Sequence, residues 1–440
     1  MSETSWPTRS IRECLAESFA GEWGAEPLPG NARVLRATDI DDEGHVIGSG
    51  ALRRLPIGKL TSRQLEDGDI LLEGSGGGPD KPVGRVAFFD AAAHQDPAVC
   101  SNFFKTLRPN RCVAEPRFLW RKLMWFYSQP MLLTFQQQTT GIINLKFEEY
   151  LNAAIAIPDD LAEQRAIAHI LDTLDTTIRE TEALIDKLKA VKQGLLHDLL
   201  TRGIDANGQL RPPQSEAPQL YKESPLGWIP REWELSTVGV EFEIQLGKML
   251  DAQKNSGAMK PYLGNKAVQW DHIDPNEVQQ MALSIADMER FRLRPGDLLV
   301  CEGGDVGRAA IWEEQLDECY YQKALHRLRP VNGFSTRLML ELLRYWMGRD
   351  VLFEYISKTS IAHFTQEKFA AVPLPVPSTD EQSRLASIIL AHKHRQEQEE
   401  GALKKLMEQK QGLMDDLLTG RVRVTPLLES VQRTAEPTGA

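Results

Sequence analysis

Two long stretches of the chain share one pattern of apolar and polar positions. Residues 164–201 and 382–419 align without a gap at a distance of 218 positions, and they are most alike in KQGLLHDLLT (192–201) and KQGLMDDLLT (410–419). In the first copy, apolar residues recur at alternating steps of four and three, which predicts a long helix with a coiled-coil seam. Such a repeat divides the chain into two helices and the two blocks that precede them.

The predicted seam is apolar along nearly the whole first helix, interrupted at Thr181 and Lys192, but only at the two ends of the second, whose middle (391–402, AHKHRQEQEEGA) is polar. A helix of this length extends roughly 57 Å at about 1.5 Å per residue, which is more than one small globule can cover. We therefore expect the two helices to form an antiparallel coiled coil; two independent core helices are the alternative. The predicted seam consists of Ile167, Leu171, Leu174, Ile178, Ile185, Leu188, Leu195, Leu385, Ile389, Leu403, Leu406 and Leu413.

The blocks that precede the two helices also resemble each other. Both combine strand-like runs, a glycine-rich turn and a shorter helical pattern, so each is predicted to be an α+β globule. Matching positions are Gly68–Asp69 with Gly296–Asp297, Gly84–Arg85 with Gly307–Arg308, and the tripeptide LRP at 107–109 and 328–330.

The composition of the connecting segments sets the domain boundaries. Residues 203–224 are rich in Pro, Gly and polar side chains, which is typical of a linker, and the C-terminal segment has few helix-favouring residues. The predicted organisation is a first globular domain at 1–158, a spacer helix at 159–202, the linker at 203–224, a second globular domain at 225–378, a second spacer helix at 379–420 and a mobile tail at 421–440.

Composition favours a cytoplasmic globular protein with no membrane partner. Of the 440 residues, 42% are hydrophobic and 26% are charged, and no apolar run is long enough to span a membrane. The N-terminus lacks a basic segment followed by an apolar core, so no signal peptide is expected. The five cysteines form no CxxC pair, which favours reduced thiols over disulfides or a zinc cluster.

The distribution of charge qualifies the net charge of −11, which by itself argues against a nucleic-acid partner. Two basic stretches, 105–122 and 321–349, occupy matching places in the two blocks, and each contains a single acidic residue. Local basic stretches of this kind favour a protein that binds a polyanion at two places. The alternative is a chance cluster on a solvated face.

No catalytic, metal-binding or cofactor-binding motif is present. The glycine-rich segments 73–85 and 302–308 lack the GxxxxGK[ST] pattern of a phosphate loop, and the chain has neither HExxH nor an NPPY-like or DPPF-like tetrapeptide of amino-methyltransferases. The same turns could place backbone amides with Lys81, Arg85 and Arg308 beside a DNA phosphate, or serve only as hairpin turns. The sequence thus describes two binding domains without chemistry of their own.

The helical repeats and one further motif carry a family resemblance. The pattern P-x(4)-EQ-x(2)-IA-x-IL-x(2)-LD-x(2)-I at Pro158–Ile178, its weaker copy at Pro377–Thr419, and LGWIPREWEL at 226–235 resemble the specificity subunit of type I restriction–modification systems. The resemblance implies two target recognition domains held apart by antiparallel conserved helices, with each domain reading one half of a split double-stranded DNA target. It also implies that the helices bind two modification subunits, which use S-adenosylmethionine to methylate adenine. Restriction and translocase subunits, which use ATP and Mg, would then join them.

Two different domains would read an asymmetric target with a gap, and polar loop residues would contact its bases. The predicted loop contacts are Thr139, Thr140, Lys358, Thr359, Ser360 and His363, with Lys81, Arg85 and Arg308 on the DNA backbone. Other readings are a methyltransferase or nuclease with built-in recognition domains, or a coiled-coil scaffold that binds only protein.

Overall fold

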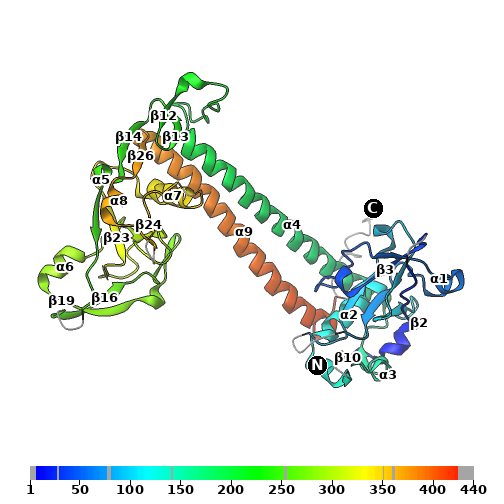
Figure 1. Cartoon of the computed structure of the whole chain (residues 1–440). Coiled ribbons are helices and arrows are strands. Elements are labelled where there is room, and N and C mark those ends of the chain that lie inside the picture. Colours follow the sequence, from blue (N-terminus) through cyan, green and yellow to red (C-terminus); the bar gives the residue numbers. More distant parts are fainter. Residues whose placement is uncertain are drawn as a thin grey trace, which may run out of the picture. The chain divides into compact units, whose positions relative to one another are not determined.

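The computed structural model forms two compact units, which are described separately (Figure 1). Unit 1 comprises Met1–Glu182 and Gly401–Ala440, and unit 2 comprises Ala183–Glu400. The described residues are 6–26, 29–76, 81–139, 142–251, 255–349, 351–358 and 362–424.

Unit 1 is built on a four-stranded antiparallel sheet of order β2-β8-β5-β6, beside a smaller sheet of order β4-β3-β7. Its strands are β1 (Thr8–Ser10), β2 (Leu15–Ala20), β3 (Ala32–Leu35), β4 (Ala51–Arg53), β5 (Ile70–Glu73), β6 (Val86–Phe88), β7 (Ala98–Cys100), β8 (Phe104–Pro109), β9 (Gln136–Thr139), β10 (Ile142–Leu145) and β11 (Ala154–Ala156). Its shorter helices are α1 (Ile57–Arg63), α2 (Pro116–Tyr127) and α3 (Phe147–Leu151).

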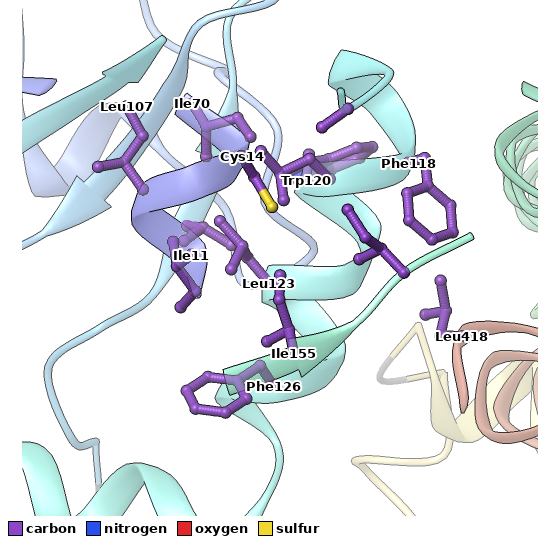
Figure 2. Packing of buried hydrophobic residues seen from close by; sticks show 14 of the residues in the cluster. Ile11, Cys14, Ile70, Leu107, Phe118, Trp120, Leu123, Phe126, Ile155 and Leu418 are labelled. Atoms are coloured by element: carbon purple, nitrogen blue, oxygen red, sulfur yellow. The ribbon is translucent and has the colours of Figure 1, made fainter. Parts of the chain in front are cut away.

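The core of unit 1 lies between the four-stranded sheet and α2. Ile70 and Leu107 from the sheet, Phe118 and Leu123 from α2, and Leu418 near the C-terminus of the long helix α9 (Thr379–Thr419) belong to one buried cluster (Figure 2). Burial of apolar area contributes roughly 25 cal/mol per Å², so this cluster both stabilises the globule and attaches the long helix to it.

Unit 2 repeats the plan. A four-stranded sheet of order β15-β23-β20-β21 packs with α7, and a three-stranded sheet of order β19-β16-β22 lies beside it. Its strands are β12 (Tyr221–Ser224), β13 (Gly227–Pro230), β14 (Glu234–Thr237), β15 (Phe242–Leu246), β16 (Ala258–Leu263), β17 (Val268–Gln269), β18 (His272–Ile273), β19 (Gln279–Leu283), β20 (Leu298–Cys301), β21 (Ala309–Ile311), β22 (Tyr320–Tyr321), β23 (Leu325–Pro330), β24 (Ser357–Lys358), β25 (Ala362–His363) and β26 (Pro373–Val376). Its shorter helices are α5 (Val238–Glu241), α6 (Ile285–Phe291), α7 (Thr336–Met347) and α8 (Gln366–Ala370).

The two long helices, α4 (Leu161–Thr201) and α9, are each 41 residues long and run antiparallel (Figure 1). In unit 1 the N-terminal half of α4 lies against the C-terminal half of α9, where Lys410 Nζ is 2.6 Å from Asp175 Oδ1. In unit 2 the opposite halves meet, and Lys189 is 3.9 Å from Glu400. The predicted α+β fold with a pair of antiparallel helices is confirmed.

The positions predicted for the seam point away from solvent. Seven of them are buried, namely Ile167, Leu171, Ile178, Ile185, Leu188, Leu385 and Ile389. The other five, Leu174, Leu195, Leu403, Leu406 and Leu413, are half-buried.

The polar middle of α9, which the pattern left without an explanation, contacts the globule of unit 2. Lys393 Nζ lies 3.3 Å from a carboxylate oxygen of Asp271, and the Lys393 side chain is only 19% exposed. Within this polar stretch, Lys393 therefore binds a carboxylate of the domain and Glu400 pairs with Lys189 of the partner helix, while most of the other positions are exposed.

The predicted linker and the start of the predicted tail both pack against a unit. Ile204 is buried and Arg211 is bonded to Glu381 at the start of α9, while Val424 belongs to the core of unit 1. Gly203 and Gly420 have φ of 62° and 77°, the left-handed conformation that ends a helix and turns the chain back. Composition rich in Gly and Pro does not separate such turns from a free linker. Residues 425–440 of the predicted tail lie outside the described residues.

A charge in the helix seam is expected to destabilise the pair. Leu188→Asp places a carboxylate at a position 7% exposed and should lower the free energy of unfolding by roughly 2–4 kcal/mol. Leu406→Asp, at a half-buried position, should cost less. The matched control is Val191→Asp on the same helix, where the side chain is 48% exposed and little change is expected. Equal melting temperatures for Leu188→Asp and Val191→Asp would contradict the assigned seam.

Candidate nucleic-acid interface

The repeated Gly-Asp dipeptide and the repeated LRP tripeptide meet in one ion pair in each unit. Arg108 donates to both carboxylate oxygens of Asp69 at 3.0 and 2.9 Å, and Arg329 donates to both of Asp297 at 2.8 and 2.7 Å. Asp69 and Asp297 are 1% and 2% exposed. The hydrogen bond to the aspartate is the largest cause of a raised arginine pKa in both pairs. These motifs therefore fasten neighbouring strands of each sheet, which is a structural role.

Several cations of the two basic stretches are buried or paired inside the protein. Arg121 is buried against Asp172 and Asp175, and Lys122 is buried with its ammonium group on the carbonyl of Leu418. In unit 2, Arg327 pairs with Glu243, Arg337 with Glu313 and Arg344 with Asp271. Binding of a polyanion by these stretches stays a prediction, but the number of cations in the sequence overstates the free positive charge, since the carboxylates that pair with these arginines are remote in sequence.

A hairpin edge is present at the same place in both units. In unit 1 the glycine-rich turn at 73–76 pairs with the β9–β10 hairpin, because the amide of Gly76 donates to the carbonyl of Ile143 at 3.1 Å. In unit 2 the turn at 302–308 pairs with the β24–β25 hairpin. The backbone amide of Phe364, the residue after β25, donates to the backbone carbonyl of Glu302 at 2.8 Å. We call these two assemblies the hairpin edges.

Three of the polar loop residues predicted to contact bases, Thr139, Lys358 and His363, fall on the hairpin edges. Thr139 ends β9, and Lys358 and His363 lie on β24 and β25, with His363 bridged to Gly303 of the glycine-rich turn. The predicted residues Thr140, Thr359 and Ser360 lie outside the described residues. The glycine-rich turns and the polar loop residues were separate predictions, and the two hairpins, which were not predicted, bring Thr139, Lys358 and His363 to those turns.

The three cations predicted to contact the DNA backbone differ in how they are held. Lys81 is 71% exposed and lies 3.0 Å from Asp42, an interaction that lowers the pKa of that carboxyl. Arg85 is 17% exposed, donates to the carbonyls of Ile40 and Ala37, and lies 3.5 Å from Glu73, whose pKa burial raises. DNA contact by Lys81 and Arg85 stays a prediction.

Arg308 occupies the position in unit 2 that Arg85 holds in unit 1. It is 15% exposed, pairs with Asp305 at 2.5 Å and donates to the carbonyl of Asn265 at 2.8 Å. Arg85 and Arg308 therefore both brace the glycine-rich turn of their own hairpin edge. Contact of Arg308 with DNA likewise stays a prediction.

A buried histidine supports the hairpin edge of unit 2. His326 Nε2 lies 2.6 Å from the carbonyl of Phe364, the residue after His363, and the ring is fully buried. Burial lowers the pKa of His326 to about 4, so the ring is neutral and Nε2–H donates to the carbonyl.

Because of this histidine, the free energy of unfolding of unit 2 is expected to decrease in acid. Between pH 6.5 and about 4 the unfolded chain binds a proton that folded His326 excludes, so stability is complete above that range and falls as the pH decreases through it. The loss should reach on the order of 3 kcal/mol. His326→Gln keeps a donor but does not titrate, and its stability relative to the wild type should rise on acidification. A constant difference from pH 7 to pH 4 in denaturant titrations would contradict this assignment.

Each long helix begins with a Glu-Gln pair that anchors it. Gln164 and Gln382 accept the backbone amides of Glu115 and Ser335 at 2.7 and 2.9 Å, the residues that cap α2 and α7. The preceding glutamates, Glu163 and Glu381, are buried, and each accepts from an arginine that follows the end of a long helix. Arg423 donates to Glu163 at 2.6 Å, and Arg211 donates to Glu381 at 2.5 Å.

Sequence reasoning missed these arginines and a tryptophan repeat. Trp6 and Trp233 both precede the strand that enters a domain and both pack on the glycine that ends a long helix, Gly420 or Gly203. The resemblance between TSWPT and REWEL was too short to find without the contacts.

The described residues hold no cluster of side chains suited to a metal ion. All five cysteines are free thiols, and burial raises the pKa of Cys14 and Cys100 to about 11, which disfavours the reactive thiolate. Among the described helices, none has the length and apolar character that crossing a membrane requires.

Two similar α+β units, each with a hairpin edge and each anchored to paired helices, define a duplicated recognition protein. The family described as type I restriction modification DNA specificity domain matches residues 30–190 and 230–408. The chain belongs to this family and carries two copies of its domain.

Curated relatives and solved structures agree with this assignment. The chain is 24% identical over 333 residues to the putative type I restriction enzyme MjaX specificity subunit of Methanocaldococcus jannaschii, covering 72% of this chain and 71% of the relative. It is 23% identical over 319 residues to the MjaVIII specificity subunit of the same organism, covering 69% and 71%.

The fold is similar to that of the type I restriction–modification S subunit from M. genitalium, with a TM-score of 0.54 and 17% identity over 95% of this chain and 97% of that one. A second solved structure, described as the basis of complex assembly and conformational transition of the type I R-M system, is similar to this chain with a TM-score of 0.53 and 18% identity. The match covers 96% of this chain and 100% of that one.

Proposed function

We propose that this chain is the specificity subunit of a type I restriction–modification system and reads a split DNA target, one half with each unit. The observation that carries the proposal is the hairpin edge, which recurs in both units with different side chains. A glycine-rich turn bonded to a two-stranded hairpin presents backbone amides and polar side chains together, the combination that phosphate positioning and base reading require.

The difference between the two edges supports an asymmetric target. Unit 1 offers Gln137, Gln138 and Asn144 on the described parts of β9 and β10, whereas unit 2 carries His363 on β25. Amide side chains pair with the edge of adenine, whereas other polar side chains pair with other bases. Because the two hairpin edges carry different side chains, two unlike half-sites are expected.

The partners follow from the family. The paired helices would bind modification subunits, two by the pseudo-repeat, and restriction and translocase subunits would join that complex. S-adenosylmethionine, ATP and Mg would be held by those subunits, because this chain has no motif for them. The chain itself would be non-catalytic and would work in the cytoplasm, where its DNA target lies.

Selection of random double-stranded DNA by the chain assembled with a modification subunit tests this function. The expected product is an enriched motif of two short blocks separated by a gap of constant length, absent when the modification subunit is used alone. Enrichment of one continuous block, or of none, would contradict reading by two domains.

A further inference from the structure

The same position of the two domain helices carries opposite charges. Helices α2 and α7 are both 12 residues long, and both are anchored at their caps by the glutamine that begins a long helix, so their sixth residues correspond. These residues are Arg121 in unit 1 and Glu341 in unit 2, and each is 2% exposed. An unpaired charge at such a depth is costly, so its surroundings must supply the opposite sign.

In unit 1 the long helices supply negative charge to Arg121. Its guanidinium lies 2.7 Å from Asp172 and also contacts Asp175 on α4, and Asp175 in turn pairs with Lys410 of α9 at 2.6 Å. Burial acts to raise the pKa of Asp175, but Arg121 and Lys410 outweigh it and hold the pKa below its usual value. The aspartate is therefore charged and buried between two cations.

In unit 2 the long helices supply positive charge instead. The repeat equates Asp175 with Lys393 and Lys410 with Lys192, so a lysine replaces the aspartate on the helix that faces Glu341. Burial and the negative charge of Asp271 raise the pKa of Glu341 above its usual value, while the positive charges of Arg344, Lys192 and Lys393 act in the opposite direction. Arg344 lies 3.9 Å from Glu341, and Lys393 is held 3.3 Å from Asp271 of the same domain.

We propose that this charge reversal assigns each recognition domain to its own half of the helix pair. Seating the second domain on the first half would bring Glu341 against Asp172 and Asp175. Seating the first domain on the second half would bring Arg121 against Lys393 and Lys192. Both arrangements bury like charges, so a duplicated chain, or a second copy of it, is kept from pairing a domain with the wrong helix segments.

This assignment goes beyond DNA reading itself, because it fixes which half-site each half of the helix pair carries. In a chain made of two similar units, apolar contacts alone distinguish weakly between the two halves of the helix pair as binding sites for a domain, since both cores use the same types of residue. Buried charges discriminate strongly and are a known device for specifying register and partner choice.

A set of four full-length chains tests the proposal. The first position carries either its own domain or residues 225–377 in place of 1–158, and helix α4 is either wild type or Asp172→Leu/Asp175→Lys. The leucine reproduces Leu390 and the lysine reproduces Lys393 of the second half. The expected result is a crossed pattern, in which each domain is stable only with its matching helix and mismatched chains melt roughly 10 °C lower or yield little soluble protein.

The control is Asp186→Lys, which reverses an exposed charge on α4 and should change the melting temperature equally little with either domain. A helix change that shifts both domains in the same direction would overturn the proposal. So would failure of the second domain to fold on the reversed helix, because the reversed seat supplies the charges it is proposed to need.

Discussion

Arg211→Ala is expected to lower the stability of unit 2 by roughly 3–5 kcal/mol, because it leaves the buried Glu381 carboxylate without its cation. Arg211 and Glu381 are 6% and 8% exposed. Both carboxylate oxygens accept from the guanidinium, at 2.5 and 3.1 Å, and further bonds come from the amide of Ile204 and the indole of Trp233. The residues joined belong to the end of α4, the start of α9 and the entry to the second domain, so the loss should extend to the whole junction.

The control for this variant is Arg384→Ala on α9, the helix that carries Glu381. Arg384 pairs with Asp380 at 2.8 Å, but the two side chains are 44% and 72% exposed, so the change should cost less than about 1 kcal/mol. Denaturant titration of the full chain measures both variants, and similar midpoints for the two would contradict the junction. Removing both charges with Arg211→Met/Glu381→Leu should recover much of the loss, because the buried carboxylate is then gone.

Exchange of residues 225–378 for the matching block of a relative is expected to change one half of the DNA target completely and leave the other half intact. All parts of the second hairpin edge, the turn at 302–308 and the β24–β25 hairpin, lie inside this block, and so does His326 beneath them. The first hairpin edge lies wholly outside it. Each half of the target should therefore follow its own block.

The matched control for the exchange is replacement of 212–220 alone, which belongs to the segment between helix and domain and contributes nothing to either edge. Methylation mapping in a host that supplies the modification subunit would give both motifs. A change in both halves after the block exchange, or a change after the control exchange, would contradict modular reading.

The helices and the order of domains were predictable because their determinants are local. The alternating apolar spacing and the repeat of KQGLLHDLLT depend only on neighbours along the chain, and the structure has both helices at 161–201 and 379–419. The α+β character of the blocks followed from equally local strand and turn patterns.

The use of the charges was not predictable, because several of the cations are paired with carboxylates far away in sequence. Arg108 bonds to Asp69 and Arg329 to Asp297, pairs that only the folded sheet brings together. A run of arginines therefore looks the same in the sequence whether it faces DNA or a buried aspartate. The polar middle of α9 is a second example, since Lys393 became interpretable only when Asp271 was found beside it.

Genome-wide mapping of adenine methylation tests the central claim most directly. Cells without other adenine methylation would carry a modification subunit either with or without this chain. The account predicts methylation that depends on this chain and falls within one asymmetric motif of two blocks separated by a gap of constant length. Methylation that is the same without the chain, or that marks a single continuous motif, would contradict it.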